Sequence, residues 1–242
     1  MAGARLAVAA AFVLAGLGRV AAGDFADREI FGFSPDGGTF AFEEFGVQDG
    51  SGFPYATIYV IDTAKDAWVS GTPIRVRIDD ETAPLSQARS KARALAAPIL
   101  ARHGIGPGGR TVVSNPSTEL SADPYAVRFL TENYANWGNH DWTLTLTPVP
   151  LPEPAGCENL GPTQGFRLDL RNWLDESWTL HDDTALPASR GCPQDYAIAD
   201  VITYFPDQSP SGVMVVLIHV ISQGFEGPDR RFLAVSTQFT DR

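Results

Sequence analysis

Apolar and polar residues alternate with a period of two along most of the chain, which is the pattern of β-strands with one buried face. The clearest pair is Thr39–Phe45 and Tyr55–Ile61, both rich in aromatic and β-branched residues. The glycine-rich stretch Asp49–Gly52 lies between them, and Pro35–Gly38 before them has the residues of a tight turn. These patterns predict a long hairpin near the start of the chain.

The same alternation recurs later, between clusters of turn residues. Strands are expected at Ala67–Ile78 with a break at Gly71–Pro73, Thr111–Ser114, Tyr125–Thr131, Trp142–Val149, Gly165–Asn172, Ser177–Asp182, Tyr196–Phe205, Val213–Ile221 and Arg231–Phe239. Val213–Ile221 is almost continuously apolar, as in a strand covered on both faces, so it should lie at the centre of the core. With Arg231–Phe239 it predicts a closing hairpin that repeats the turn and strand pattern of the opening one. We expect the glycine-rich tips of the two hairpins to lie side by side.

One segment has a helical period instead. The apolar residues of Thr82–His103 recur at intervals of three and four, at Leu85, Ala88, Ala92, Leu95 and Ile99. The acidic run Asp79–Glu81 stands where the positive end of the helix is expected. Pro98 lacks a backbone donor and predicts a kink or an end of the helix near Ala97. The outward positions of the helix are expected to form a basic surface made of Arg89, Lys91 and Arg93.

These elements predict a mainly β fold of antiparallel sheets with one N-proximal amphipathic helix. The run Phe33–Gly37 resembles the turn that opens a blade in propellers of the TolB and WD40 kind. A complete propeller needs at least about four blades of four strands, which is more than this chain predicts. A partial propeller and a sandwich both remain open at this point. The length of residues 24–242 suits a single β-rich domain.

The first 23 residues have the three parts of a secretory signal peptide. Arg5 stands near the start, the apolar segment Leu6–Leu17 follows, and small residues come before Asp24. The apolar segment is well short of the roughly twenty residues that a membrane-spanning helix needs. We therefore expect cleavage near Ala22 or Gly23 and a soluble, secreted or periplasmic domain without membrane insertion.

The charge of the chain limits the class of partner. The sequence has 18 basic and 29 acidic residues and a formal net charge of −11. Removal of the signal peptide takes away two arginines and no acidic residue, so the mature domain is more acidic still. Nucleic acid and anionic membranes attract basic surfaces, so neither is expected as a partner.

The two cysteines, Cys157 and Cys192, follow the export signal, and an oxidising compartment allows thiols to pair. A single disulfide is therefore expected. Two cysteines without nearby histidines cannot complete a tetrahedral zinc site, so no metal site is expected.

Motifs for catalysis and cofactor binding are absent from the sequence. It has no zinc-protease pattern, nucleophile elbow, phosphate loop or dinucleotide fingerprint, so no cofactor is expected. His140-Asp141 and His181-Asp182 have the residue types of an acid–base pair, but neighbouring residues of a strand point to opposite faces. His219 lies inside the apolar run Val213–Ile221 and is expected to be a hydrogen-bonded core residue.

Binding is the function that the sequence favours, because loops on a rigid β scaffold commonly carry binding sites. The tips Gln48–Phe53 and Gln223–Arg230 would supply the contact surface, with a mixed-charge patch made of Asp49, Glu226, Asp229, Arg230 and Arg231. The aromatic faces of Trp137, Trp142, Trp173 and Trp178 would either stack against a ligand or pack in the core. We expect a non-enzymatic binding or interaction module for an envelope or extracellular protein or a carbohydrate. The alternative is a secreted hydrolase with carboxylate and histidine acid–base chemistry, for example Glu226 with His181.

The signal peptide and three runs of the sequence, FSPDGGTFAFEEFGVQDGSGFPY, LPASRGC and GFEGPDRRFLAV, are similar to a bacterial family of predicted secreted proteins, domain-of-unknown-function family 2259. The resemblance spans the mature chain. It implies export and a single domain, and it implies no activity, cofactor or catalytic residue.

Overall fold

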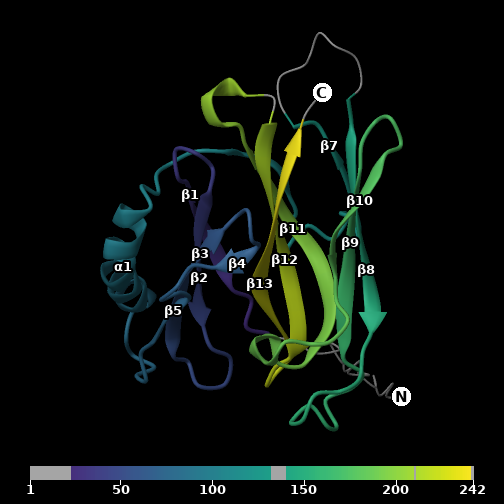
Figure 1. The fold of residues 1–242 in the computed structure, drawn as a ribbon. Coiled ribbons are helices and arrows are strands. Elements are labelled where there is room, and N and C mark those ends of the chain that lie inside the picture. Colours follow the sequence, from purple (N-terminus) through teal and green to yellow (C-terminus); the bar gives the residue numbers. More distant parts are fainter. Residues whose placement is uncertain (1–22, 132–139, 210, 241–242) are drawn as a thin grey trace, which may run out of the picture.

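The computed structural model describes residues 23–131, 140–209 and 211–240, and its strands form three antiparallel sheets. The fold is mainly β with one α-helix, as the sequence predicts. Residues 1–22, which belong to the expected signal peptide 1–23, and Trp137 lie outside the described residues. Figure 1 shows the layers in order: the helix, a first sheet, a central sheet and an outer sheet.

The sheets are built from successive parts of the chain, except that the central sheet combines an early strand with the last three. The first sheet contains β1 (Asp27–Phe33), β2 (Thr39–Val47), β3 (Pro54–Asp62), β4 (Ala67–Trp68) and β5 (Ile74–Arg77), with β5 paired to β3. The outer sheet has the order β10 (Ser177–Asp182), β9 (Gln164–Arg171), β8 (Trp142–Pro150) and β7 (Ala126–Phe129). The central sheet has the order β13 (Pro228–Thr240), β12 (Ser211–Gln223), β11 (Pro193–Tyr204) and β6 (Arg110–Ser114).

Strand β12 contributes to two hydrophobic cores, because successive side chains of a strand point to opposite faces. Met214, Val216 and Ile218 pack in the core between the central and outer sheets. Val215 and Leu217 pack in the core between the central and first sheets. The prediction that Val213–Ile221 is covered on both faces is confirmed.

The helix α1 (Leu85–Arg102) covers the outward face of the first sheet. Its contact face consists of alanines four residues apart, Ala88, Ala92 and Ala96, all fully buried. These small side chains let the helix approach the strands closely. Leu95, expected on the apolar stripe, is 55% exposed instead.

The helix differs from the expectation at its first residue and at Pro98. It begins three residues later than Thr82, because Asp80 accepts hydrogen bonds from the backbone and the hydroxyl of Thr82 and holds that residue in a turn. It also continues through Pro98 to Arg102, one residue short of the expected end at His103. Of the two alternatives at Pro98, the end near Ala97 is therefore wrong, and the kink stays a prediction. The helix loses one backbone donor at Pro98, and the contacts of Ile99 and Leu100 with the core beyond it favour continuation.

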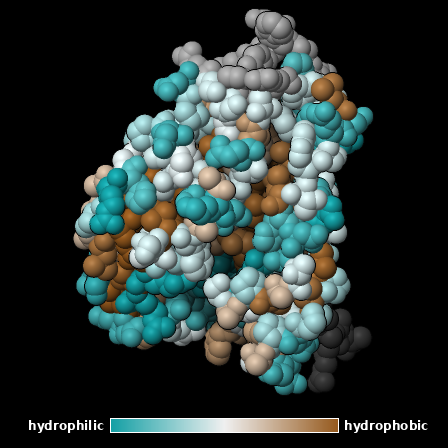
Figure 2. Space-filling view, in the orientation of Figure 1, coloured by the Kyte–Doolittle hydropathy of each residue, from teal (hydrophilic) through white to brown (hydrophobic). Residues whose placement is uncertain are grey.

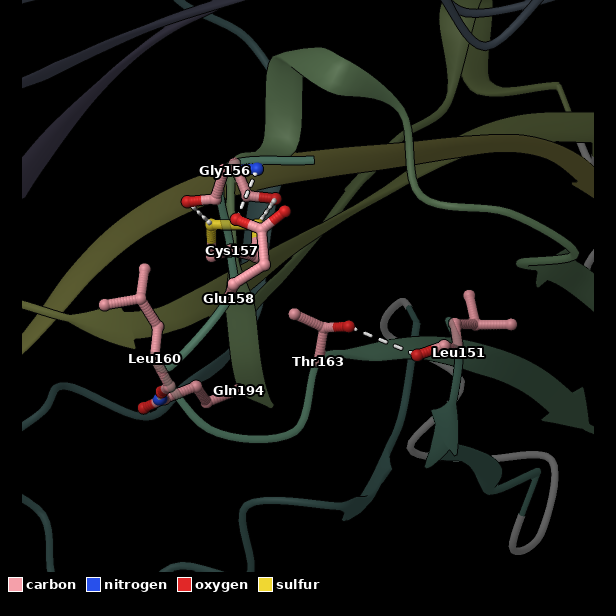
Figure 3. The surroundings of a disulfide bond; sticks show 9 residues. Leu151, Gly156, Cys157, Glu158, Leu160, Thr163 and Gln194 are labelled. Carbon is pink, nitrogen blue, oxygen red and sulfur yellow. Dashed lines mark hydrogen bonds between the residues drawn. A yellow bond between two sulfur atoms is a disulfide. The ribbon is translucent and has the colours of Figure 1, made fainter. Parts of the chain in front are cut away.

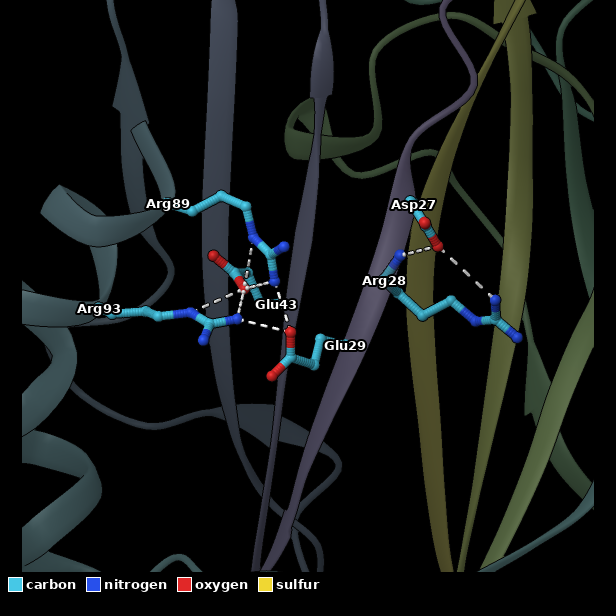
Figure 4. A network of polar contacts seen from close by, with 6 residues as sticks. All are labelled: Asp27, Arg28, Glu29, Glu43, Arg89 and Arg93. Carbon is cyan, nitrogen blue, oxygen red and sulfur yellow. Dashed lines mark hydrogen bonds and ion pairs between the residues drawn. The ribbon is translucent and has the colours of Figure 1, made fainter. Parts of the chain in front are cut away.

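Four charged residues join the helix to the first sheet, and we call them the helix clamp: Glu29, Glu43, Arg89 and Arg93. Figure 4 shows both guanidinium groups turned back toward the carboxylate of Glu43, whose side chain has no exposed surface. The Nη2 atoms of Arg89 and Arg93 lie 2.8 Å and 2.5 Å from Oε2 of Glu43. The expected basic outer surface is therefore wrong for Arg89 and Arg93, and only Lys91 points to solvent.

Strand β1 was not predicted from the sequence. Its pairing with β2 shifts by one residue between Ile30 and Gly32, and Gly32 has a φ of 106°. This β-bulge interrupts the period of two that would have revealed the strand. A side chain at Gly32 would also clash with the backbone of Gly106, which pairs with Phe33.

The expected disulfide between Cys157 and Cys192 is present, with the two Cα atoms 5.5 Å apart. Figure 3 shows its surroundings, where Gln194 and Leu160 lie beside the linked loops. The bond joins the proline-rich loop between β8 and β9 to the segment that follows the short 3-10 helix Ala188–Arg190. It therefore fixes the position of residues 187–192 beside the outer sheet.

Candidate functional site

A cleft of about 820 Å³ opens where the three sheets meet, and we call it the central cleft. Its walls are the inner face of β3 to β5, the edge strand β13, and His181 of β10 together with residues 187–190 that follow this strand. Figure 2 shows hydrophobic atoms at the base of a hollow in the middle of this face. Its volume falls in the range of small-molecule sites in proteins.

The floor of the central cleft contains a buried carboxylate. Phe40, Phe42 and Glu44 alternate along β2 and point toward the central sheet, so Glu44 occupies a position where the pattern calls for an apolar residue. The side chain of Glu44 accepts a hydrogen bond of 2.6 Å from the backbone N–H of Phe232. Burial raises the pKa of Glu44 to about 7, although that hydrogen bond and the charge of Arg231 act in the opposite direction. Near neutral pH both the protonated and the ionised forms of Glu44 are therefore populated.

Next to Glu44 lies a second buried polar group made of Asp24, Tyr55 and Arg231. The hydroxyl of Tyr55 donates to Oδ1 of Asp24 over 2.9 Å, and Nη2 of Arg231 lies 2.5 Å from Oδ2 of the same carboxylate. Burial raises the pKa of Tyr55 far above its ordinary value, so its hydroxyl keeps the proton that it donates. The three side chains satisfy one another, and Tyr55 and Arg231 line the cleft.

The mouth of the cleft is aromatic and positively charged. The ring of Tyr59 stacks on Phe42 with 4.8 Å between centroids, and Trp68, which is 43% exposed, lies beside Tyr59. The guanidinium of Arg75 lies 5.6 Å from the centre of the Trp68 ring. Within the described part of the chain, Arg75 forms no hydrogen bond or ion pair with a carboxylate, although its charge acts on the buried Glu44. It is available to bind an anionic group from a ligand.

The third wall comes from the outer sheet. Buried Asp183 accepts hydrogen bonds from Nε2 of His181 at 2.8 Å, from the backbone N–H of Phe166 at 3.0 Å, and from Arg190. Burial alone would raise the pKa of Asp183, but these three donors hold it below its ordinary value. His181 thus pairs with Asp183, two residues away on the same face, and not with Asp182. Both His181 and Arg190 line the cleft.

The structure divides the five predicted binding residues between two places. At the hairpin tips, the backbone N–H of Glu226 donates to Oδ2 of Asp49 over 2.7 Å, so the two tips meet. Arg231 lines the central cleft, and Asp229 accepts a hydrogen bond from the backbone N–H of Asp24 nearby. Arg230 stacks its guanidinium 4.4 Å from the ring centre of Phe25. The hydrolase alternative pairs Glu226 with His181. Among the described residues, His181 lines the cleft and Glu226 does not.

Of the described tryptophans at the outer sheet, Trp142 packs in the core, whereas Trp178 is 44% exposed. Trp142 is 2% exposed, and the rings of Trp173 and Trp178 lie around it. His140 stacks on Trp173 with 4.2 Å between ring centres. His219 is buried on β12 as expected, and burial lowers its pKa to about 4, so the ring is neutral. The expected hydrogen bond is wrong, because neither ring nitrogen has a hydrogen-bond partner among the described residues.

The residues that define the cleft are not among those predicted from the sequence. The alternation of strand faces was used there to place apolar residues and not charged ones. The signal for Glu44 is in the sequence, because the alternation places this acidic residue on the same strand face as Phe40 and Phe42. Tyr59, Trp68 and Arg75 lie on three different strands, and only the sheet pairing brings them together. Among residues 23–131, 140–209 and 211–240, no cluster of three or more His, Cys, Asp or Glu could hold a metal ion.

Residues 41–238 match the family model described as predicted secreted protein, DUF2259. The chain belongs to this family. The DUF2259 match includes every residue that lines the central cleft, from Phe42 to Val235. No curated protein and no solved structure matches the chain. In the described part of this DUF2259 protein, no helix is long and apolar enough to cross a membrane.

Proposed function

We propose that this secreted-family protein is a non-enzymatic binding module and that the central cleft is its ligand site. The observation that supports this proposal is the cleft itself: a preformed hollow of about 820 Å³ with an aromatic and apolar base and a few convergent polar groups. The hairpin tips, which the sequence favoured as the contact surface, lie at the end of the domain where Asp49 meets Glu226. The tips adjoin the cleft, because Gln48 of the first tip and Arg231, the residue after the second tip, both line it.

The contacts inside the cleft favour binding over turnover. Asp24, Tyr55 and Arg231 satisfy one another, and so do His181, Asp183 and Arg190. A hydrolase needs a base directed at a nucleophile or a water. His181 bonds Asp183 through Nε2, but within the described residues no hydroxyl or thiol is hydrogen-bonded to its other ring nitrogen. These groups provide fixed walls, and Arg75 at the mouth has a charge to offer to a ligand.

Glu44 is the observation that favours the hydrolase alternative. A buried carboxyl group with a pKa of about 7 has the property of a general acid, and it lies in a cleft that also contains His181. If the protein is a hydrolase, the natural protein converts a bound substrate to products that mass spectrometry detects. The Glu44→Gln variant would bind the same substrate and leave it intact.

The cleft can be tested by filling it. Ala67 lines the central cleft, and Ala64 is an exposed residue of the same turn that does not line it. We expect a panel of oligosaccharides and short peptides to contain a ligand that Ala67→Trp binds at least about tenfold more weakly, as measured by calorimetry. Ala64→Trp should bind that ligand as the natural protein does.

Two results would contradict this proposal. One is a panel in which no compound binds the natural protein at millimolar concentration. The other is a ligand whose affinity is equal in the natural protein, Ala67→Trp and Ala64→Trp, which would place binding outside the cleft.

A further inference from the structure

One edge of the central sheet faces the central cleft. β13 is the last strand of that sheet, with β12 on one side and no strand on the other along the cleft. In an antiparallel pair, the backbone groups of alternate residues point away from the partner strand. On β13 these are the even-numbered residues, because the N–H groups of Arg230, Phe232 and Ser236 bond to Asp24, Glu44 and Asp66 rather than to β12.

Between the bonds at Phe232 and Ser236, the backbone of one residue, Ala234, makes no hydrogen bond on the cleft side in the described part of the chain. Ala234 lines the cleft, and by the alternation its N–H and C=O point into it. Neither group has a partner in residues 23–131, 140–209 or 211–240. We call the backbone from Phe232 to Ser236 the edge window.

Two carboxylates limit the length of the edge window. Oε2 of Glu44 lies 2.6 Å from the N–H of Phe232, and Oδ1 of Asp66 lies 2.7 Å from the N–H of Ser236. Four residues of extended strand separate these two N–H groups, which is about 14 Å. An added strand of about three residues fits between them. Side chains that close the rest of an edge also protect it from unregulated pairing with other chains.

The walls around the edge window indicate the side chains of the added segment. Tyr59 and Trp68 present aromatic surface on one side of the cleft. Arg75, stacked on Trp68 and without a hydrogen bond or ion pair to a carboxylate in the described part of the chain, offers a bidentate donor to an acidic side chain. The charge therefore favours a peptide with aspartate or glutamate, flanked by an apolar residue for the aromatic surface.

We propose that the central cleft captures an extended, acidic peptide segment of another protein, which pairs with β13 at Ala234 as a short added strand. This inference rests on the proposed binding function and names the class of its partner. Main-chain hydrogen bonds give such a complex its affinity, and the alternating side chains give it specificity.

The first experiment modifies the peptide and leaves the protein unchanged. Acetylated and amidated pentapeptides, with aspartate or lysine at each position in turn, are screened by affinity selection with mass spectrometry. For the best binder, each backbone nitrogen is then methylated singly. We expect methylation of the one nitrogen that faces Ala234 to weaken binding about tenfold, and methylation of the adjacent nitrogens, which point away from β13, to change it less than about twofold.

The second experiment follows the protein. Exchange of the Ala234 amide hydrogen should slow when the peptide is added, while that of the Lys91 amide, in helix α1 and away from the cleft, should not change. Arg75→Gln should weaken binding of the aspartate-containing peptide about tenfold, with Lys65→Gln, outside the cleft, as the matched control.

The outcomes separate this inference from the proposed function. A peptide that binds with a flat methylation series and an unprotected Ala234 amide overturns strand pairing and leaves the cleft as a binding site. Binding of oligosaccharides alone, lost in Ala67→Trp, has the same consequence. Binding of nothing in either panel overturns both.

Discussion

Two adjacent glutamates of β2 have opposite environments, although both are buried. Glu43 faces helix α1, where two arginines bind its carboxylate and Glu29 completes the helix clamp. Glu44 faces the central cleft, where one backbone N–H is its hydrogen-bond donor and burial raises its pKa to about 7. Successive side chains of a strand point to opposite faces, and here this alternation alone separates their roles. One carboxylate holds the helix to the sheet, and its neighbour lies in the cleft, where its protonation can change.

The largest effect is expected from breaking the clamp at Glu43. In Glu43→Gln, two guanidinium groups lose the buried one of the two carboxylates that they share and keep only the half-exposed Glu29. We expect a loss of about 3 kcal/mol in the free energy of unfolding, because the charges left behind are partly desolvated. Urea unfolding followed by circular dichroism measures this. A loss below about 1 kcal/mol would show that the clamp behaves as an exposed ion pair.

A smaller and pH-dependent effect is expected at Glu44. Its pKa is about 7 in the folded protein and 4.5 as the ordinary value, so the folded state holds the proton more tightly. The resulting stabilisation is complete below the ordinary value and is lost as the pH rises through about 7. Glu44→Gln cannot titrate, so relative to this variant the natural protein should lose about 2 to 3 kcal/mol of stability between pH 4.5 and pH 8.

Unfolding of both proteins across that pH range tests the expectation for Glu44. A difference in stability that stays constant with pH would mean that Glu44 titrates as an exposed carboxyl group does. Glu43→Gln, measured in the same series, shows how much of the change belongs to the strand rather than to the cleft.

The smallest effect is expected at Glu29, the other acid of the clamp. Its side chain is 47% exposed, and it touches the same two arginines as Glu43. We expect Glu29→Gln to reduce stability by less than about 1 kcal/mol, because solvent and salt screen exposed pairs. Unfolding at low and high salt measures it. Equal losses in Glu29→Gln and Glu43→Gln would remove burial as the reason for the difference.

The sequence predicted most strands because their cores demand alternation, and it predicted β12 because that strand is apolar on both faces. It failed at β1, where the bulge at Gly32 breaks the period. It placed Arg89 and Arg93 in solvent, because helical spacing alone does not reveal a buried carboxylate on the opposing sheet. It did not predict the cleft, since Tyr59, Trp68 and Arg75 are brought together by pairing between β3, β4 and β5.

The two-sided burial of β12 also has a consequence for the order in which the protein matures. The first sheet and the outer sheet both pack against the central sheet, and β11 to β13 of that sheet are residues 193–240 of the chain. Until these residues have left the ribosome, each earlier sheet lacks the layer that buries its apolar face. We expect a chain in this state to stay incompletely folded until the last strands arrive, which would suit the export that membership of a predicted secreted family implies.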